Sequence, residues 1–164
     1  MISKKIQDAI NAQINAEMYS SYLYLSMSAF AMSANFKGFA HWFKVQANEE
    51  TKHAMKLYDH LLDRGGKVEL APIKQPPTHF QNLLDAFEQT YEHEKKVTGL
   101  INKLYETAKK ENDYAAQVML QWFINEQVEE EASSCEILQK LQLLGEKATG
   151  SLLYIDKELK KREG

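Results

Sequence analysis

The 164-residue sequence contains little cysteine, proline or glycine, and each scarcity excludes a class of structure. Its single cysteine, Cys135, excludes an internal disulfide framework and any metal site built from several thiolates. All three prolines fall between Pro72 and Pro77, so the rest of the chain is free of this helix breaker. The seven glycines are also few for a chain of this length. These scarcities predict a chain that is mostly helical.

The sequence also lacks an excess of positive charge and any long apolar run. Twenty Lys and Arg against 23 Asp and Glu give a net charge of −3, whereas nucleic acids and anionic membranes require clustered positive charge. No apolar run approaches the roughly 18 residues of a membrane span, and the start MISKKIQDAIN lacks the apolar run of a signal peptide. We therefore expect no nucleic-acid partner, no membrane partner and a cytoplasmic location.

The residues that are present predict an all-α fold in a single domain, residues 1–164. Start and stop signals predict four long helices. The first runs from about Ser3 to a break at Ser33–Asn35, and the others span about Lys37 to Arg64, Thr78 to Lys110 and Asn112 to Leu144. The amphipathic segment LLYIDKELKK, 152–161, predicts a short fifth helix at the C-terminus.

The connection GGKVELAPIKQPP between the second and third helices is too long for a tight turn. Extended at about 3.3 Å per residue it reaches roughly 43 Å, and the second helix at about 1.5 Å per residue is roughly 42 Å long. The connection can therefore run the whole length of the bundle. The second and third helices would then be parallel, which predicts a four-helix bundle with one long crossover.

Each long helix carries a glutamate near its middle, on the same stripe as its apolar residues. Offsets of 7 and 11 residues nearly complete whole helical turns, and around each glutamate these positions are mainly Ile, Leu, Phe and Tyr. The four glutamates are Glu17, Glu50, Glu94 and Glu130. In a bundle they would meet at one level, so the sequence predicts a carboxylate layer inside the apolar core.

A single inward glutamate is usually paired with a Lys or Arg, but these four have no such partner near the middle of their stripes. Four uncompensated carboxylates would each cost several kcal/mol to desolvate, so we expect a cation there. His53 is at i+3 from Glu50 and projects to the same side of the helix. Oxygen-rich ligation with one imidazole suits Fe(II), Mn(II) or Zn(II), and four carboxylates suit two ions bridged by a shared glutamate.

This combination of Glu17, Glu50-x-x-His53, Glu94 and Gln127-x-x-Glu130 resembles the non-haem bacterial ferritin pattern, over the whole chain. The resemblance implies a 24-subunit hollow shell that oxidises Fe(II) with dioxygen or hydrogen peroxide and stores ferric oxyhydroxide. It implies Glu17, Glu50 and His53 as ligands of a first iron. Bridging Glu50, with Glu94 and Glu130, would hold a second iron, with Gln127 near it and Tyr24 bordering the centre.

The same resemblance has two further implications. Glu49, Glu126 and Glu129, with Glu130 shared, match a third iron site on the way to the cavity, although a solvated acidic helix face explains them equally simply. Haem is not expected, because Thr51 stands where the haem-binding branch of the family has methionine. The other histidines, His41, His60, His79 and His93, are interpreted as surface or packing residues.

Two functions remain open at this level. The first is a ferroxidase and iron store with two irons per subunit, or three if the additional acidic group binds one. The second is a structural or binding bundle that holds an inert ion such as Zn(II). Spacing alone does not separate them, because redox-active and inert divalent metals use the same hard ligands.

Overall fold

The computed structural model describes residues 2–145 and 149–164 of the chain. In these residues it contains five helices and no strand: α1 Lys4–Ser33, α2 Lys37–Asp63, α3 Leu83–Lys110, α4 Tyr114–Leu144 and α5 Thr149–Leu159. The predicted all-α fold with a short C-terminal helix is confirmed.

Polar caps decide where three of the long helices begin. Ser3 Oγ accepts a hydrogen bond from Ile6 N at the start of α1, and Asp113 accepts one from Ala116 N at the start of α4. Asn82 does the same for α3, by accepting from Asp85 N at 2.9 Å. Each cap satisfies an N–H that has no partner within its own helix.

The observed boundaries correct the sequence prediction at three places. Helix α3 begins at Leu83 rather than near Thr78, because Asn82 caps its first turn. Helix α4 begins at Tyr114 rather than Asn112, whose φ of 54° lies in the left-handed region and breaks the helix. The last helix, α5, spans Thr149–Leu159 instead of residues 152–161.

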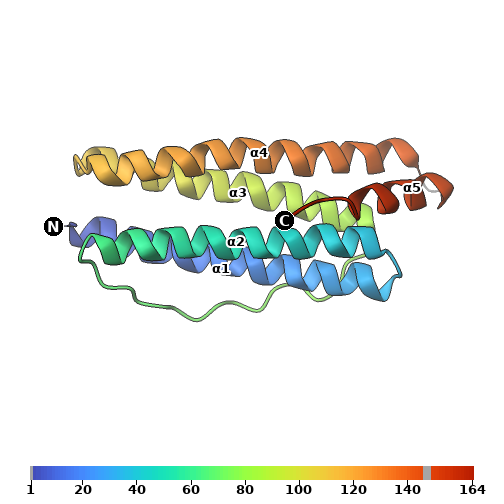
Figure 1. The fold of residues 1–164 in the computed structure, drawn as a ribbon, viewed down its shortest axis with the longest axis horizontal. Helices are drawn as coiled ribbons and strands as arrows, with labels where there is room; N and C mark the ends of the chain where they lie inside the picture. The colour runs from blue at the N-terminus through green and yellow to red at the C-terminus, as the bar shows by residue number, and fades with distance from the viewer. Residues whose placement is uncertain (1, 146–148) are drawn as a thin grey trace.

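The helices form a bundle of two tight pairs, α1 with α2 and α3 with α4, as Figure 1 shows. The connection from α2 to α3 runs the length of the bundle beside α1, so α2 and α3 point in the same direction. Side chains of α1 hold this crossover: Asn11 Nδ2 donates to Lys67 O at 2.9 Å, and Asn15 Nδ2 donates to Ala71 O at 3.2 Å. The predicted crossover topology is thereby confirmed.

The apolar core consists of two separate clusters, one toward each end of the bundle. One is rich in aromatic residues and includes Phe39, Phe43 and Phe87. The other is mainly aliphatic, is completed by Phe123, and includes Ile10 and Leu57. The level between these two clusters is where the buried polar residues of the four long helices gather.

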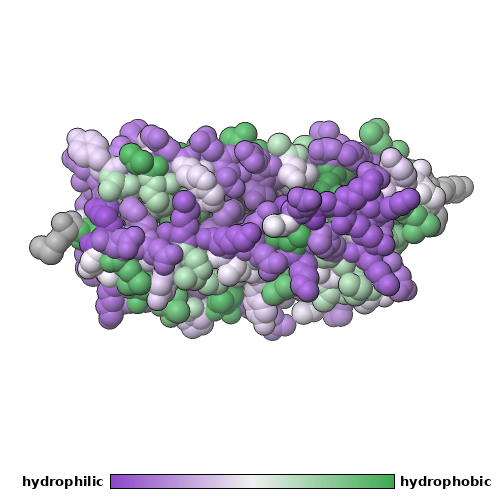
Figure 2. All heavy atoms as spheres, in the orientation of Figure 1, coloured by the Kyte–Doolittle hydropathy of each residue, from purple (hydrophilic) through white to green (hydrophobic). Residues whose placement is uncertain are grey.

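The surface seen in Figure 2 is largely hydrophilic, with smaller apolar areas scattered over it. Within the described parts of the chain, none of the helices combines the length and the apolar character needed to cross a lipid bilayer.

Candidate metal centre

The four stripe glutamates are buried in the middle of the bundle. Glu17, Glu50 and Glu94 are each 1% exposed, and Glu130 is 7% exposed. Each comes from a different long helix and lies close to that helix's midpoint. Each glutamate lies on the apolar stripe of its helix. Because these stripes pack against one another, the four glutamates meet at one level.

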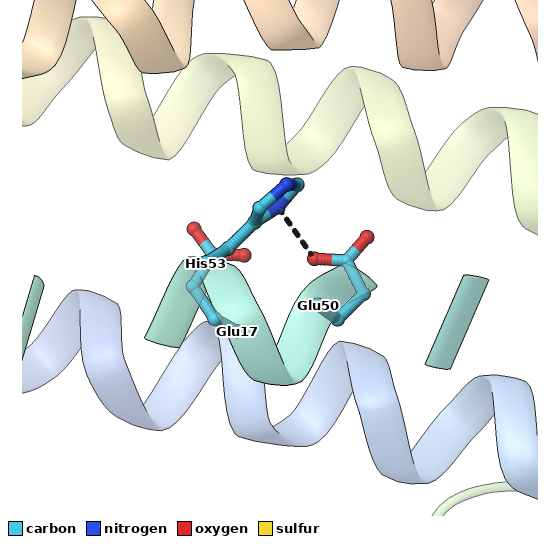
Figure 3. A group of neighbouring side chains, drawn as sticks. All are labelled: Glu17, Glu50 and His53. Atoms are coloured by element: carbon cyan, nitrogen blue, oxygen red, sulfur yellow. Dashed lines mark ion pairs between the residues drawn. The ribbon is translucent and has the colours of Figure 1, made fainter. Parts of the chain in front are cut away.

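Glu17, Glu50 and His53 form one tight group, drawn in Figure 3. One potential ligand atom from each of the three lies within 4.8 Å of the others. His53 Nδ1 is 3.3 Å from Glu50 Oε2, and Gln13 Nε2 donates to Glu17 Oε1 at 2.8 Å. The i+3 spacing of Glu50 and His53 on α2 places both beside Glu17 of α1.

The other two carboxylates are held by neutral donors. The Tyr24 hydroxyl donates to Glu94 Oε1, and the Gln46 amide donates to Glu130 Oε2. Gln127 Nε2 lies 3.2 Å from Glu94 Oε2 and also donates to the main-chain oxygen of Glu94. These contacts orient Glu94 and Glu130 without neutralising their charge.

Burial and mutual repulsion raise the pKa values of the layer. Burial, followed by the negative charge of Glu50, raises the pKa of Glu17 well above its ordinary value. Burial and the charges of Glu94 and Glu130 do the same for the pKa of Glu50. Burial, then the charge of Glu94, raises the pKa of Glu130 to about 7. The layer therefore favours either bound protons or a bound cation.

Two features of this layer fit a metal ion. Among the described side chains, two buried carboxylate oxygens, Glu17 Oε2 and Glu50 Oε2, have no hydrogen-bond partner of acceptable geometry. Buried polar atoms are almost always satisfied, and these two belong to the same group as His53. Carboxylate oxygens with one imidazole form a donor set suited to Fe(II), Mn(II) or Zn(II).

A second group adjoins the first and involves part of the additional acidic cluster. Glu126 joins His53 and Glu130, again with potential ligand atoms within 4.8 Å of one another, and His53 Nε2 is 3.9 Å from Glu126 Oε2. Glu49 instead forms an ion pair with Arg162 at 2.6 Å, and Glu129 is exposed. The structure therefore brings Glu126 to the centre and holds Glu49 in a different contact.

The remaining histidines lie outside both groups. His93 packs on the Tyr24 ring and shares a 2.8 Å hydrogen bond with Ser20, and burial lowers its pKa to about 4. His41 contacts the main-chain oxygen of Arg162, and His79 is exposed. His60 is half-buried, and burial lowers its pKa.

Sequence reasoning missed Gln13, Gln46 and Arg162 as neighbours of the layer. Gln13 and Gln46 each lie four residues before a layer glutamate of their own helix, a spacing that places them one turn away on the same face. That signal was available. Arg162 is 116 residues from its partner Gln46, so no local pattern could have indicated the contact.

Comparisons with known proteins agree with this geometry. The ferritin-like domain family matches residues 7–144. The bacterial non-heme ferritin of Bacteroides fragilis is 43% identical over 162 residues, 99% of this chain and 100% of that protein; that of Campylobacter jejuni is 43% identical over 155 residues, 94% of this chain and 92% of that protein. An open-pore ferritin from the hyperthermophilic archaeon Archaeoglobus fulgidus matches with a TM-score of 0.98 at 49% identity, covering 99% of this chain and 100% of that one. The chain therefore belongs to the ferritin family.

Proposed function

We propose that this chain is an iron-storage ferroxidase, which oxidises Fe(II) at the carboxylate layer and keeps the ferric product inside a 24-subunit cytoplasmic shell. The single observation that carries the proposal is the buried group of Glu17, Glu50 and His53, with its two unsatisfied carboxylate oxygens. Membership of the ferritin family supports iron as the metal. No haem is part of the proposal.

Two Fe(II) ions are the substrates, and the ligand residues are divided between them. Glu17, Glu50 and His53 hold the first, while Glu50, Glu94 and Glu130 hold the second, so that Glu50 bridges them. Each Fe(II) gives up one electron, and dioxygen accepts both electrons with two protons to become hydrogen peroxide. Carboxylates favour the ferric product because they are hard anionic ligands.

The neighbouring neutral side chains orient the ligands of this pair of iron positions. Tyr24 and Gln127 both contact Glu94, and neither adds charge. Ligand orientation by such contacts commonly changes metal affinity by about 10- to 100-fold. Gln127, placed beside Glu94, can also contact the second iron through its amide oxygen.

The test of this function begins with the wild-type protein. In air, Fe(II) added at about two ions per subunit should be oxidised much faster than in buffer, and 24 copies of the 18.9 kDa chain should elute as a particle of roughly 450 kDa. Anaerobic titration with Zn(II) gives the comparison for an inert metal. Tight Zn(II) binding without accelerated Fe(II) oxidation would instead support the structural-metal alternative.

We also propose a third, weaker iron position next to this pair, drawn from Glu49, Glu126 and Glu129 with Glu130 shared. Its support is Glu126, which lies beside His53 and Glu130. Replacing Glu49, Glu126 and Glu129 with Ala together should leave two irons bound and oxidised per subunit, but alter the dioxygen consumed per Fe(II) and slow repeated additions. Oxygen-electrode measurements over successive small Fe(II) additions test this, and wild-type values in the triple variant would exclude the third position.

A further inference from the structure

The C-terminal segment lies along one stripe of α2, the helix that supplies Glu50 and His53. Asp156 Oδ1 accepts hydrogen bonds from Gly38 N at 2.7 Å and Phe39 N at 3.0 Å. The first turn of α2 has no side-chain cap of its own, since Phe36 precedes it, so the Asp156 carboxylate of α5 supplies the missing acceptor. Docking needs a glycine at Gly38, because an added Cβ would lie 1.6 Å from Asp156 O.

After α5 ends, the chain continues along α2 toward the middle of the bundle, where Figure 1 places the C-terminus. Two contacts fix Arg162 there. Its main-chain oxygen is 2.8 Å from His41 Nε2, and its guanidinium lies over the Trp42 ring at 4.7 Å. A guanidinium on an aromatic face, with its own main chain tied down, is restricted to few orientations.

The guanidinium forms hydrogen bonds with two side chains of α2 near the carboxylate layer. Arg162 Nη2 donates to Gln46 Oε1 at 2.9 Å and to Glu49 Oε2 at 2.6 Å. The other end of the same amide, Gln46 Nε2, donates to Glu130 Oε2. Gln46 is 1% exposed, so its amide has no water to replace either partner. An uninterrupted chain of hydrogen bonds therefore runs from Arg162 through Gln46 to Glu130.

We propose that Arg162 is a positioning residue for the metal centre, acting through the Gln46 amide to hold the Glu130 carboxylate in the orientation that binds the second metal ion. The inference rests on the proposed function, since it concerns the same centre. Gln46 occupies one oxygen of Glu130 and leaves the other to face a cation. The Arg162 guanidinium, which only donates hydrogen bonds, fixes the Gln46 carbonyl on its own side and thereby keeps the amide N–H groups directed at Glu130.

The test uses the assembled full-length protein and Co(II), a redox-inert probe, in anaerobic calorimetric titrations. Wild-type protein should show two binding steps per subunit for the dinuclear pair, one tighter and one weaker, before the third position fills. Arg162→Ala should weaken the weaker step by about tenfold, leave the tighter step within about twofold, and change the visible Co(II) spectrum of the second ion. The matched control is Lys161→Ala, which removes the same charge one residue away, where Lys161 pairs with Glu158.

A double-mutant cycle separates positioning from a general structural role. Gln46→Leu breaks the connection at its centre and should reproduce the Arg162→Ala loss, and the double variant should lose no more than either single variant. Co(II) affinities within twofold of wild type in Arg162→Ala, or losses that add in the double variant, would overturn the inference. So would a lower thermal midpoint with unchanged Co(II) binding.

Failure of assembly and failure of the proposed function give different results. If Arg162→Ala does not assemble, Gln46→Leu alone decides, because it leaves the Arg162 to Glu49 ion pair in place. If the wild-type protein binds no Co(II) and does not accelerate Fe(II) oxidation, the proposed function fails. Two Co(II) ions bound equally well by wild type and both single variants would refute only the role of Arg162.

Discussion

Replacing Glu50 with alanine should slow rapid Fe(II) oxidation by at least about 100-fold, while the protein still folds and assembles. In the proposed centre Glu50 bridges both iron positions, and losing merely an orienting neighbour commonly costs about 10- to 100-fold. Folding should survive, because burial and the charges of Glu94 and Glu130 already disfavour the ionised form of Glu50, as its raised pKa shows. Stopped-flow absorbance at low iron loading measures the rate.

His53→Ala should give a loss of similar size, because it removes the only imidazole in the group. The matched control is Asp59→Ala, which removes an exposed carboxylate from the same helix. Rapid oxidation at low loading that persists in both Glu50→Ala and His53→Ala would refute the dinuclear assignment. Equal slowing of Fe(II) oxidation by Asp59→Ala would show that removing any polar side chain of α2 has this effect, so that it is not specific to the ligand residues.

Metal-free protein should become less stable relative to its Glu130→Gln variant as the pH rises from about 5 to about 8. Burial raises the pKa of folded Glu130 from 4.5 to about 7, so in this window the folded state binds more protons than the unfolded state. Stability contributed by the protonated carboxyl is then lost with rising pH, by about 1.4 kcal/mol per pH unit and about 3 kcal/mol in total. The glutamine side chain of the variant would remain neutral throughout.

Denaturant melts of both chelator-treated proteins at several pH values measure this effect, and the difference between their free energies of unfolding removes contributions from other titrating groups. Zn(II) should reverse the trend in the wild type, because a bound cation favours the ionised carboxylates. A stability difference between the two proteins that stays constant across the pH range would show that Glu130 has an ordinary pKa in the folded protein.

Much of the fold was predictable because it depends on repeating local patterns. The apolar stripes located four long helices, and the thirteen residues from Gly65 to Pro77 are enough to span the bundle. The carboxylate layer followed from the same periodicity, since Glu17, Glu50 and Glu94 occupy equivalent stripe positions.

What could not be predicted depends on contacts between distant segments or on competition between weak signals. The start of α3 was predicted too early because Thr78 and Asn82 are both acceptable caps, and in the structure it is Asn82 that caps the helix. The attachment of Arg162 to Glu49 joins residues 113 apart, and nothing in either local sequence specifies the other. Sequence spacing therefore located the layer glutamates, but not the side chains that orient them.

The carboxylate layer separates the two apolar clusters and so divides the core of the bundle into two parts. Without a cation this layer holds buried carboxyl groups whose burial and mutual repulsion raise their pKa values, so it stabilises the bundle less than the apolar packing on either side. Partial opening from one end should then stop at this layer. Amide hydrogen exchange in the metal-free protein should accordingly show two units that unfold separately. With a bound metal ion the two should unfold as one cooperative unit.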